Sequence, residues 1–557
     1  MFYKGSWKNK SAVGISRKQQ RQGCSSAENG WKWGSFMNSE KMRVEQKTAT
    51  KNSIVRLFFV VLLIALQFVW IYYLITFLES HVPWLSTVIT SGALVLALTI
   101  SARHMNASYR MFWIIMVLVF PVLGIPFYAI MGRKNSTKRM RVRFDKVDHM
   151  LFSRLQQQQE VMERLEKEDL RAAGTSNYLL KTCRFPVYQN TDIQFFPDAA
   201  LAFESQLKDL KLAEKFIFME YFAIEKDGAF QRVLEILKRK AEQGVEIRIV
   251  YDDIGSISFL DSRFTREMES YGIHCQRFNP VLPFLNIFMN NRDHRKIMVI
   301  DGKIGYTGGY NMANEYFHLT QPYGFWKDTG VRLQGDAVRT LTAICMEMWG
   351  LMSENIQIEQ GERFLTDYPY HAKETGYVQP YADSPLDDEP TGEEVYMNIL
   401  RTAKNYAWFV TPYLLITDEM KREFVGAAKR GVDVRIITPG IPDKKMVYQE
   451  TRSYYAGLVR GGVRIYEYTP GFCHAKMSIA DDISATVGTI NLDYRSLYLH
   501  FENGVLFHHC KIVNEIHQDF ETMFSESTEV TDHYRKGAQN ILQRSVRAML
   551  RFVAPLL

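Results

Sequence analysis

The stretch His294-Arg-Lys296-Ile-Met-Val-Ile-Asp301 returns later in the chain in a second version, His474-Ala-Lys476-Met-Ser-Ile-Ala-Asp481. Both copies have the form H-x-K-x-x-x-x-D. Each is followed by a glycine-containing turn that ends in asparagine, Gly308-Gly309-Tyr310-Asn311 in the first copy and Gly488-Thr489-Ile490-Asn491 in the second. The doubling supplies two histidines, two lysines and two asparagines, a set of groups suited to one phosphate diester.

The residues between each lysine and aspartate predict a β-strand, at 297–300 and at 477–480. Side chains two apart on a strand point to the same face, so the His and Lys of each copy can converge on one anion. Each Asp follows at the strand end, where we expect a local structural partner rather than a proton carrier. The glycine turn allows close approach of the backbone and places the Asn amide as another donor. The candidate catalytic set is His294, Lys296, Asp301, His474, Lys476 and Asp481, with phosphate-binding support from Gly309, Asn311 and Asn491.

The segments around the two copies also repeat. Strand, helix and strand are predicted at 217–224, 230–243 and 245–251, and again at 406–411, 418–430 and 432–437. This alternation predicts an α/β fold with two duplicated αβα domains, and the repeat indicates that they share one active site. We expect these domains at 190–370 and 371–557, with the seam in the polar residues 368–392. A basic helical linker, 134–189, precedes them and contains a predicted helix over 144–172.

Two facing half-sites suit a phosphodiester that reacts through a covalent intermediate. One histidine attacks phosphorus, and the other protonates the leaving oxygen and later deprotonates the incoming hydroxyl, because imidazole ionises near neutral pH. The lysines and asparagines would stabilise the phosphoryl oxygens. The six cysteines have no CxxC spacing, and no cluster of His, Cys or carboxylates has metal-ligand spacing, so we expect catalysis without a metal or cofactor.

The N-terminal part predicts membrane association. Residues 1–53 form a basic tail, with 11 Lys and Arg against 3 acidic residues, which we expect to be disordered. The segment 54–133 contains three apolar runs, at 57–78, 82–100 and 112–131, of which the last is interrupted by Pro121, Gly124 and Pro126. The net charge of +7 is too small to indicate a nucleic-acid partner.

The charges between the runs predict a topology. The loop before Trp84 has no Lys or Arg and is expected outside, whereas the loop with Arg103 and Arg110 is expected inside. The tail and the segment after Met131 are both basic, which requires an even number of crossings. We therefore expect runs 57–78 and 82–100 to cross the membrane, 112–131 to be re-entrant or interfacial, and the catalytic domains to be cytoplasmic.

At these residues the chain resembles the phospholipase D superfamily, whose duplicated motif is named for its His, Lys and Asp. Within it, Trp113, Pro121, Gly124, Tyr128 and Gly132 are similar to the W…P…G…Y…G segment of bacterial cardiolipin synthases. Three further elements resemble those that follow the two motifs in the family: Phe325-Trp326-Lys327-Asp328, Asn491-Leu-Asp493-Tyr-Arg495-Ser496 and Phe501-Glu502-Asn503.

The resemblance implies an enzyme of the bacterial cell membrane that joins two phosphatidylglycerol molecules into cardiolipin and releases glycerol. It implies His294 as nucleophile and His474 as general acid and base, and the reverse order stays open. It also implies that a downstream carboxylate holds the second nitrogen of each histidine, and Asp328 and Glu502 have matching positions after the two motifs. The alternatives are a membrane-bound hydrolase that produces phosphatidic acid, a nuclease of the same superfamily, and a membrane scaffold without activity.

Overall fold

The computed structural model describes residues 84–103, 106–132, 138–281, 290–353, 362–365 and 368–536, and scattered residues between 62 and 77. The predictions for the tail 1–53 lie outside the described residues. The run 57–78 is described at only some positions, and those are helical.

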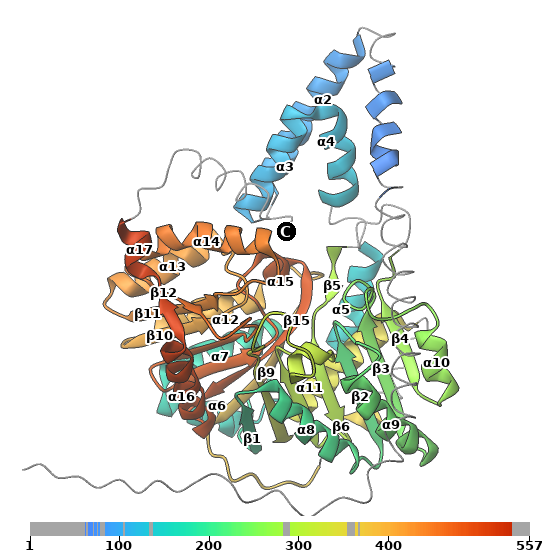
Figure 1. Ribbon diagram of the computed structural model, residues 1–557, viewed down its shortest axis with the longest axis vertical. Helices are drawn as coiled ribbons and strands as arrows, with labels where there is room; N and C mark the ends of the chain where they lie inside the picture. Colours follow the sequence, from blue (N-terminus) through green and yellow to red (C-terminus); the bar gives the residue numbers. More distant parts are fainter. Residues whose placement is uncertain are drawn as a thin grey trace, which may run out of the picture. The chain divides into compact units, whose positions relative to one another are not determined.

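Two sheets form the catalytic part (Figure 1), and the strand order of the first recurs within the second. The first has the order β1-β8-β7-β6-β2-β3-β4, and the second contains the equivalent order β9-β15-β14-β13-β10-β11-β12. In each sheet the equivalent strands pair with the same polarity: β2, β3 and β4 are parallel, as are β10, β11 and β12. The duplicated α/β fold is therefore confirmed.

The first half has the following bounds: β1 (Thr191–Phe196), α8 (Ala199–Leu210), β2 (Phe216–Tyr221), α9 (Ala229–Glu242), β3 (Glu246–Asp252), α10 (Phe264–Ser270), β4 (His274–Phe278), β5 (Arg292–Asp293), which pairs with β15 of the second sheet, β6 (Lys296–Ile300), β7 (Ile304–Gly308), η4 (Asn314–Phe317), β8 (Gly330–Gly335) and α11 (Val338–Met352). The second has β9 (Tyr377–Asp383), α12 (Thr391–Thr402), β10 (Tyr406–Val410), α13 (Asp418–Lys429), β11 (Asp433–Pro439), α14 (Lys445–Arg460), β12 (Arg464–Tyr468), β13 (Met477–Ala480), β14 (Ser484–Gly488), α15 (Tyr494–Tyr498), β15 (His500–His508), α16 (Lys511–Ser525), β16 (Ser527–Glu529) and α17 (Thr531–Lys536), after the short η5 (Glu362–Phe364).

The same local signals end equivalent helices in the two halves. After α9 the chain turns at Gly244, whose φ is 84°, and after α13 it turns at Gly431, whose φ is 95°. Glycine adopts this left-handed conformation without the steric cost that a Cβ would bring. After these two glycines the chain enters β3 and β11, which pair with β2 and β10 near the centre of each sheet.

Alternate residues of the central strands enter different cores, as expected for strands covered on both faces. Phe218, Ile297 and Val299 belong to one core, whereas Met219, Met298 and Ile300 belong to another. The first of these cores continues through Leu341 and Ile344 of α11 into β9 and β15 of the second half. The two halves therefore share a hydrophobic core.

The prediction of one linker helix over 144–172 is wrong. The segment forms α5 (Lys138–Phe152), α6 (Gln159–Glu168) and α7 (Leu170–Cys183). Asp169 ends one helix and caps the next, because its side chain accepts from the backbone N–H groups of Arg171 and Ala172. Val147 and Leu179 enter the shared core, so α5 and α7 pack on the catalytic part.

The membrane segment has one helix long and apolar enough to cross a membrane among the described residues, α2 (Trp84–Ser101). The broken third run forms α3 (Ala107–Val119), α4 (Pro121–Phe127) and the π-helical turn η1 (Tyr128–Gly132). A Cβ on Gly124 would lie 2.3 Å from the carbonyl oxygen of Met116, so glycine lets α4 fold back against α3 (Figure 1).

Candidate active site

His294 lies between β5 and β6, and its ring is oriented by a carboxylate from the other half. Its Nδ1 is 2.8 Å from Oε1 and 3.0 Å from Oε2 of Glu502. The backbone fixes this pairing, because the N–H of His294 donates to the carbonyl of Phe501 at 2.9 Å. Since a carboxylate accepts, the neutral ring of His294 carries its proton on Nδ1 and leaves Nε2 free.

His474 repeats this arrangement in the opposite direction. Its Nδ1 is 2.7 Å from Oδ2 of Asp328, and its backbone N–H donates to the carbonyl of Lys327 at 2.7 Å. Each histidine is therefore held by the carboxylate of the other repeat. Both rings are buried, at 7% exposure for His294 and 6% for His474. Both carboxylates were expected from the resemblance, but the expectation that the carboxylate downstream of each histidine holds it is wrong for His474, because Asp328 precedes it in the chain.

Each carboxylate is supported by the turn of its own repeat. The hydroxyl of Thr489 donates to Oε2 of Glu502 at 2.5 Å. At the equivalent position of the first repeat, a Cβ on Gly309 would lie 2.1 Å from Oδ1 of Asp328, so only glycine leaves room for that carboxylate. Gly309 thus supports Asp328. The sequence did not predict a role for Thr489, although its alignment with the predicted supporting residue Gly309 could have indicated one.

The two motif lysines are buried beside the histidines. The ammonium of Lys296 donates to the carbonyl of His294 at 2.5 Å, and that of Lys476 donates to the carbonyl of His474 and lies 2.7 Å from its Nδ1. Burial lowers the pKa of Lys296 to about 7 and that of Lys476 to about 8. Both lysines therefore ionise near neutral pH.

Asn311 lies beside the His474 half-site, because its hydrogen-bond partner Tyr316 has its ring centroid 5.3 Å from that of His474. The side-chain oxygen of Asn311 accepts from the N–H of Ala223 at 3.2 Å, and its amide donates to the hydroxyl of Tyr316 at 2.7 Å. One proton of this amide remains for another acceptor. Asn491 is also buried, at 5% exposure.

The motif aspartates lie at the ends of β6 and β13, where they tie strands together. The carboxylate of Asp301 accepts from the backbone N–H groups of Glu214, Lys215 and Phe216 at 2.7–2.9 Å. Asp481 makes the equivalent contacts with Lys404, Asn405 and Tyr406 at 2.7–2.9 Å. Both residues have a φ of 55°. Their carboxylates bind backbone and are not directed at the histidines.

The electrostatics of the site follow from burial among several cations. Burial, Lys296 and His500 hold the pKa of His294 well below its ordinary value, with smaller contributions from Lys476 and His474. Burial and Lys476 lower the pKa of His474 in the same way. Burial raises the pKa of Asp328 to about 7 and that of Glu502 well above its usual range. A bound anion would favour the charged forms of the two lysines and of the two histidines.

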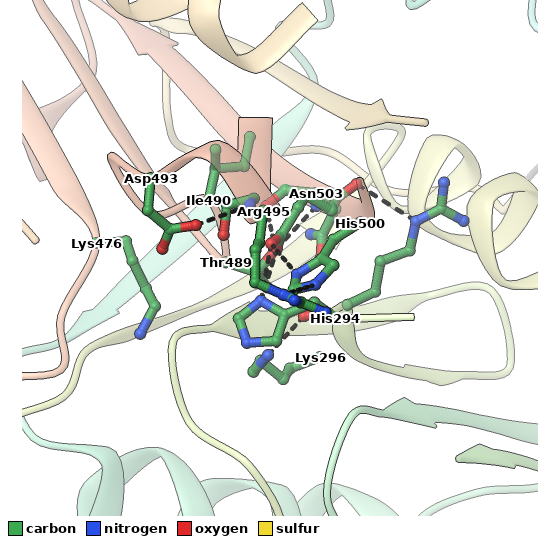
Figure 2. A network of polar contacts seen from close by, with 12 residues as sticks. His294, Lys296, Lys476, Thr489, Ile490, Asp493, Arg495, His500 and Asn503 are labelled. Atoms are coloured by element: carbon green, nitrogen blue, oxygen red, sulfur yellow. Dashed lines mark hydrogen bonds and ion pairs between the residues drawn. The ribbon is translucent and has the colours of Figure 1, made fainter. Parts of the chain in front are cut away.

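One group among the described residues has the composition of a metal site. One ligand atom each from His294, His500 and Glu502 lies within 4.8 Å of the others. Two imidazoles and a carboxylate are suitable ligands for a transition metal. However, Nδ1 of His294 already bonds to Glu502, so an ion at this position would compete with the histidine–carboxylate pair. Figure 2 shows His294, Arg495 and His500 gathered together.

Comparisons with known proteins match the segments that contain these residues. The family model "Cardiolipin synthase, PLD-like domain" matches residues 207–329 and 396–524, which include both motifs and both carboxylates. The model "Phospholipase_D-nuclease N-terminal" matches residues 88–133.

Similar proteins extend over most of the chain. A cardiolipin synthase of Alkalihalophilus pseudofirmus is 31% identical over 88% of this chain and 98% of its own length. An uncharacterized protein of Streptococcus mutans is 39% identical over 80% of this chain and 96% of its own length. Among solved structures, a phosphatidylserine synthase of Haemophilus influenzae has a TM-score of 0.53 at 15% identity, covering 69% of this chain and 100% of that chain. At this identity the last likeness concerns the fold alone.

Proposed function

Because this chain belongs to the cardiolipin synthase family of proteins with phospholipase D-like domains, we propose that it joins two phosphatidylglycerol molecules into cardiolipin and releases glycerol. It is thus a transferase of substituted phosphate groups that acts on phospholipids. The observation that carries the proposal is the crossed arrangement of His294 with Glu502 and of His474 with Asp328. The carboxylates bind Nδ1 of each histidine, so Nε2 of each histidine remains available to attack phosphorus or to transfer a proton.

In the first half-reaction, Nε2 of His294 attacks the phosphorus of one phosphatidylglycerol. The N–P bond forms as the bond from phosphorus to the glycerol oxygen breaks. His474, protonated on Nε2 when the anionic phosphodiester is bound, gives that proton to the glycerol oxygen. Glu502 stabilises the positive charge that develops on the ring of His294. The ammonium groups of Lys296 and Lys476 stabilise the phosphoryl oxygens.

In the second half-reaction, His474 takes the proton from a headgroup hydroxyl of the second phosphatidylglycerol. The resulting oxygen attacks phosphorus, the N–P bond breaks, and cardiolipin leaves. Water in place of this hydroxyl would produce phosphatidic acid, so the outcome depends on which acceptor reaches the intermediate.

Product analysis tests the reaction. Purified protein is incubated with phosphatidylglycerol labelled in its headgroup and acyl chains, and lipids and glycerol are separated. We expect cardiolipin and glycerol in equal amounts. Phosphatidic acid as the sole lipid product would refute the synthase and support a hydrolase, and no turnover would support an inactive scaffold.

A substrate with an acidic leaving group separates the roles of the two histidines. Phosphatidyl-p-nitrophenol needs no proton on its leaving oxygen, so a nucleophile remains essential whereas a general acid does not. We expect His294→Ala to abolish the release of p-nitrophenol and His474→Ala to retain a burst. The opposite result would reverse the assignment.

For the membrane segment, we propose that runs 57–78 and 82–100 cross the bilayer, that α3 to η1 form a re-entrant or interfacial unit, and that the catalytic domains are cytoplasmic. The break before Pro121 and the basic residues after Met131 support this topology. A reporter fused after Arg143 is expected to be located in the cytoplasm. A reporter found outside the membrane would contradict the topology.

A further inference from the structure

His500 is a buried imidazole next to the site that the proposed mechanism does not use. It begins β15, two residues before Glu502, and its ring centroid lies 5.4 Å from that of His294. Its side chain is 10% exposed, and its Nδ1 is buried without a hydrogen bond. This Nδ1 lies 3.7 Å from Oε1 of Glu502, the atom that also receives the bond from His294.

Arg495 determines which nitrogen of His500 carries the proton. Nε of Arg495 lies 3.3 Å from Nε2 of His500, and an arginine can only donate, so Nε2 is the acceptor. Burial and the nearby cations hold the pKa of His500 well below its ordinary value, so the ring is neutral and its single proton is on Nδ1. The charged and titratable groups around it are Arg495 of α15, Arg292 of β5, Lys296 of β6, Glu502 of its own strand, and His294.

The other half-site has an indole at the equivalent position. Backbone bonds to the two histidines align Phe501 with Lys327, so His500 corresponds to Trp326. The ring of Trp326 lies 5.7 Å from that of His474, much as His500 lies beside His294. The duplicated site is therefore asymmetric: only the half with Glu502 has an imidazole whose proton faces the carboxylate.

We propose that His500 is a positioning residue that presents the proton on its Nδ1 to Glu502 and so keeps this carboxylate ionised and aligned with His294. At 3.7 Å from Oε1, this proton stabilises the negative charge of Glu502 electrostatically, and a small shift of either side chain would bring the two atoms within hydrogen-bond range. The inference rests on the proposed use of His294 as nucleophile. His500 lies beside His294 in space, although it comes from the second half of the chain and is not part of the duplicated motif.

Two conservative variants separate this role from a structural one. In His500→Asn the amide nitrogen Nδ2 takes the place of Nδ1, which retains a donor toward Glu502. In His500→Gln the amide lies near the former Nε2, which removes that donor. Without the donor the ionised form of Glu502 is less stable, so its pKa rises and the acid limb of activity moves to higher pH.

The experiment measures p-nitrophenol release from phosphatidyl-p-nitrophenol between pH 5 and 9 with the full-length protein in detergent micelles. For His500→Gln we expect an upward shift of the acid limb by about one pH unit, equal to about tenfold slower release below the limb. For His500→Asn we expect a limb close to that of the wild type. Trp326→Phe, at the equivalent position beside His474, serves as the matched control and should not move the limb.

If His500→Gln does not fold, Arg495→Lys tests the same link, because lysine retains the charge but has a methylene group at the position from which Nε donates to His500. A smaller shift in the same direction is expected. Equal shifts in the Asn and Gln variants, or no shift in the Gln and Arg495→Lys variants, would overturn the positioning role. Release of p-nitrophenol by the wild type without cardiolipin formation would refute the synthase alone, and absence of release would refute both.

Discussion

At the residue scale, Glu502 and Asp328 occupy equivalent positions in the two repeats, but the turns beside them differ. Glu502 accepts from the hydroxyl of Thr489, whereas Asp328 lies against the bare backbone of Gly309. A hydrogen bond to a charged group contributes about 1.5–3 kcal/mol, which is large enough to affect the ionisation of a buried carboxylate. The half-site of Glu502 therefore depends on a side chain that the half-site of Asp328 does not have.

We predict that Thr489→Val lowers kcat by about tenfold to a hundredfold, because Glu502 loses this bond. Thr489→Ser keeps the hydroxyl and should retain most of the activity. Since the hydroxyl also accepts from the N–H of Asn503 at 2.9 Å, thermal unfolding must be measured alongside the initial rates. Equal rates for the Val and Ser variants at equal folded fraction would contradict the prediction.

The lysines give the site a pH dependence in binding. Lys296 and Lys476 have pKa values lowered to about 7 and about 8, so each loses its positive charge as the pH rises through that value. The charged form binds a phosphodiester anion and is present below the pKa. We predict that KM for phosphatidylglycerol rises above about pH 7 to 8, with a smaller change in kcat. Initial rates in mixed micelles between pH 6 and 9 measure both, and a constant KM would count against the prediction.

At the element scale, the aspartates of the motif act on stability. Asp301 binds three backbone N–H groups that precede and begin β2, so it joins the end of β6 to the start of its neighbour. We predict that Asp301→Ala lowers the free energy of unfolding by about 2–3 kcal/mol, because these donors lose their acceptor. The variant Asp301→Asn should lose less, since it keeps Oδ1, which binds two of the three groups, and asparagine tolerates a positive φ.

The measurement for these variants combines thermal unfolding with activity per folded molecule. We expect lower stability and nearly unchanged specific activity, because the carboxylate does not touch the histidines. Loss of specific activity in both variants at full folding would assign Asp301 a part in catalysis.

Local sequence patterns predicted most helices and strands. The features that they did not predict depend on contacts between residues far apart in the sequence. Periodicity and glycine stops placed β2, α9 and β3 within a few residues, because these signals lie inside each element. The crossed pair of His294 and Glu502 joins residues 208 positions apart and depends on β5 pairing with β15, a two-residue bridge without a sequence pattern. The single linker helix was wrong because helical composition continues across Asp169, where one capping side chain starts a new helix.

At the scale of the whole molecule, the site and the core both require the two halves together. We propose 190–370 and 371–557 as duplicated domains, but α11 of the first packs in the same core as β9 and β15 of the second. Separating the halves would expose this core and leave each histidine without its carboxylate. The burial of apolar side chains, at roughly 1.5–3 kcal/mol each, outweighs the loss of one covalent connection.

This balance predicts that the chain tolerates a cut between the halves. A protease site is inserted next to His371, an exposed residue at the boundary between the two proposed domains. The protein is cleaved in detergent micelles, and its size-exclusion chromatography and phosphatidylglycerol turnover are compared with those of the uncut form. We expect the fragments to elute together and to retain most of the activity, because the core and the crossed pairs hold them without the connection. The uncut insertion variant is the control for the insertion itself. Fragments that separate under these conditions, or that remain together without activity, would show that the connection itself maintains the shared site.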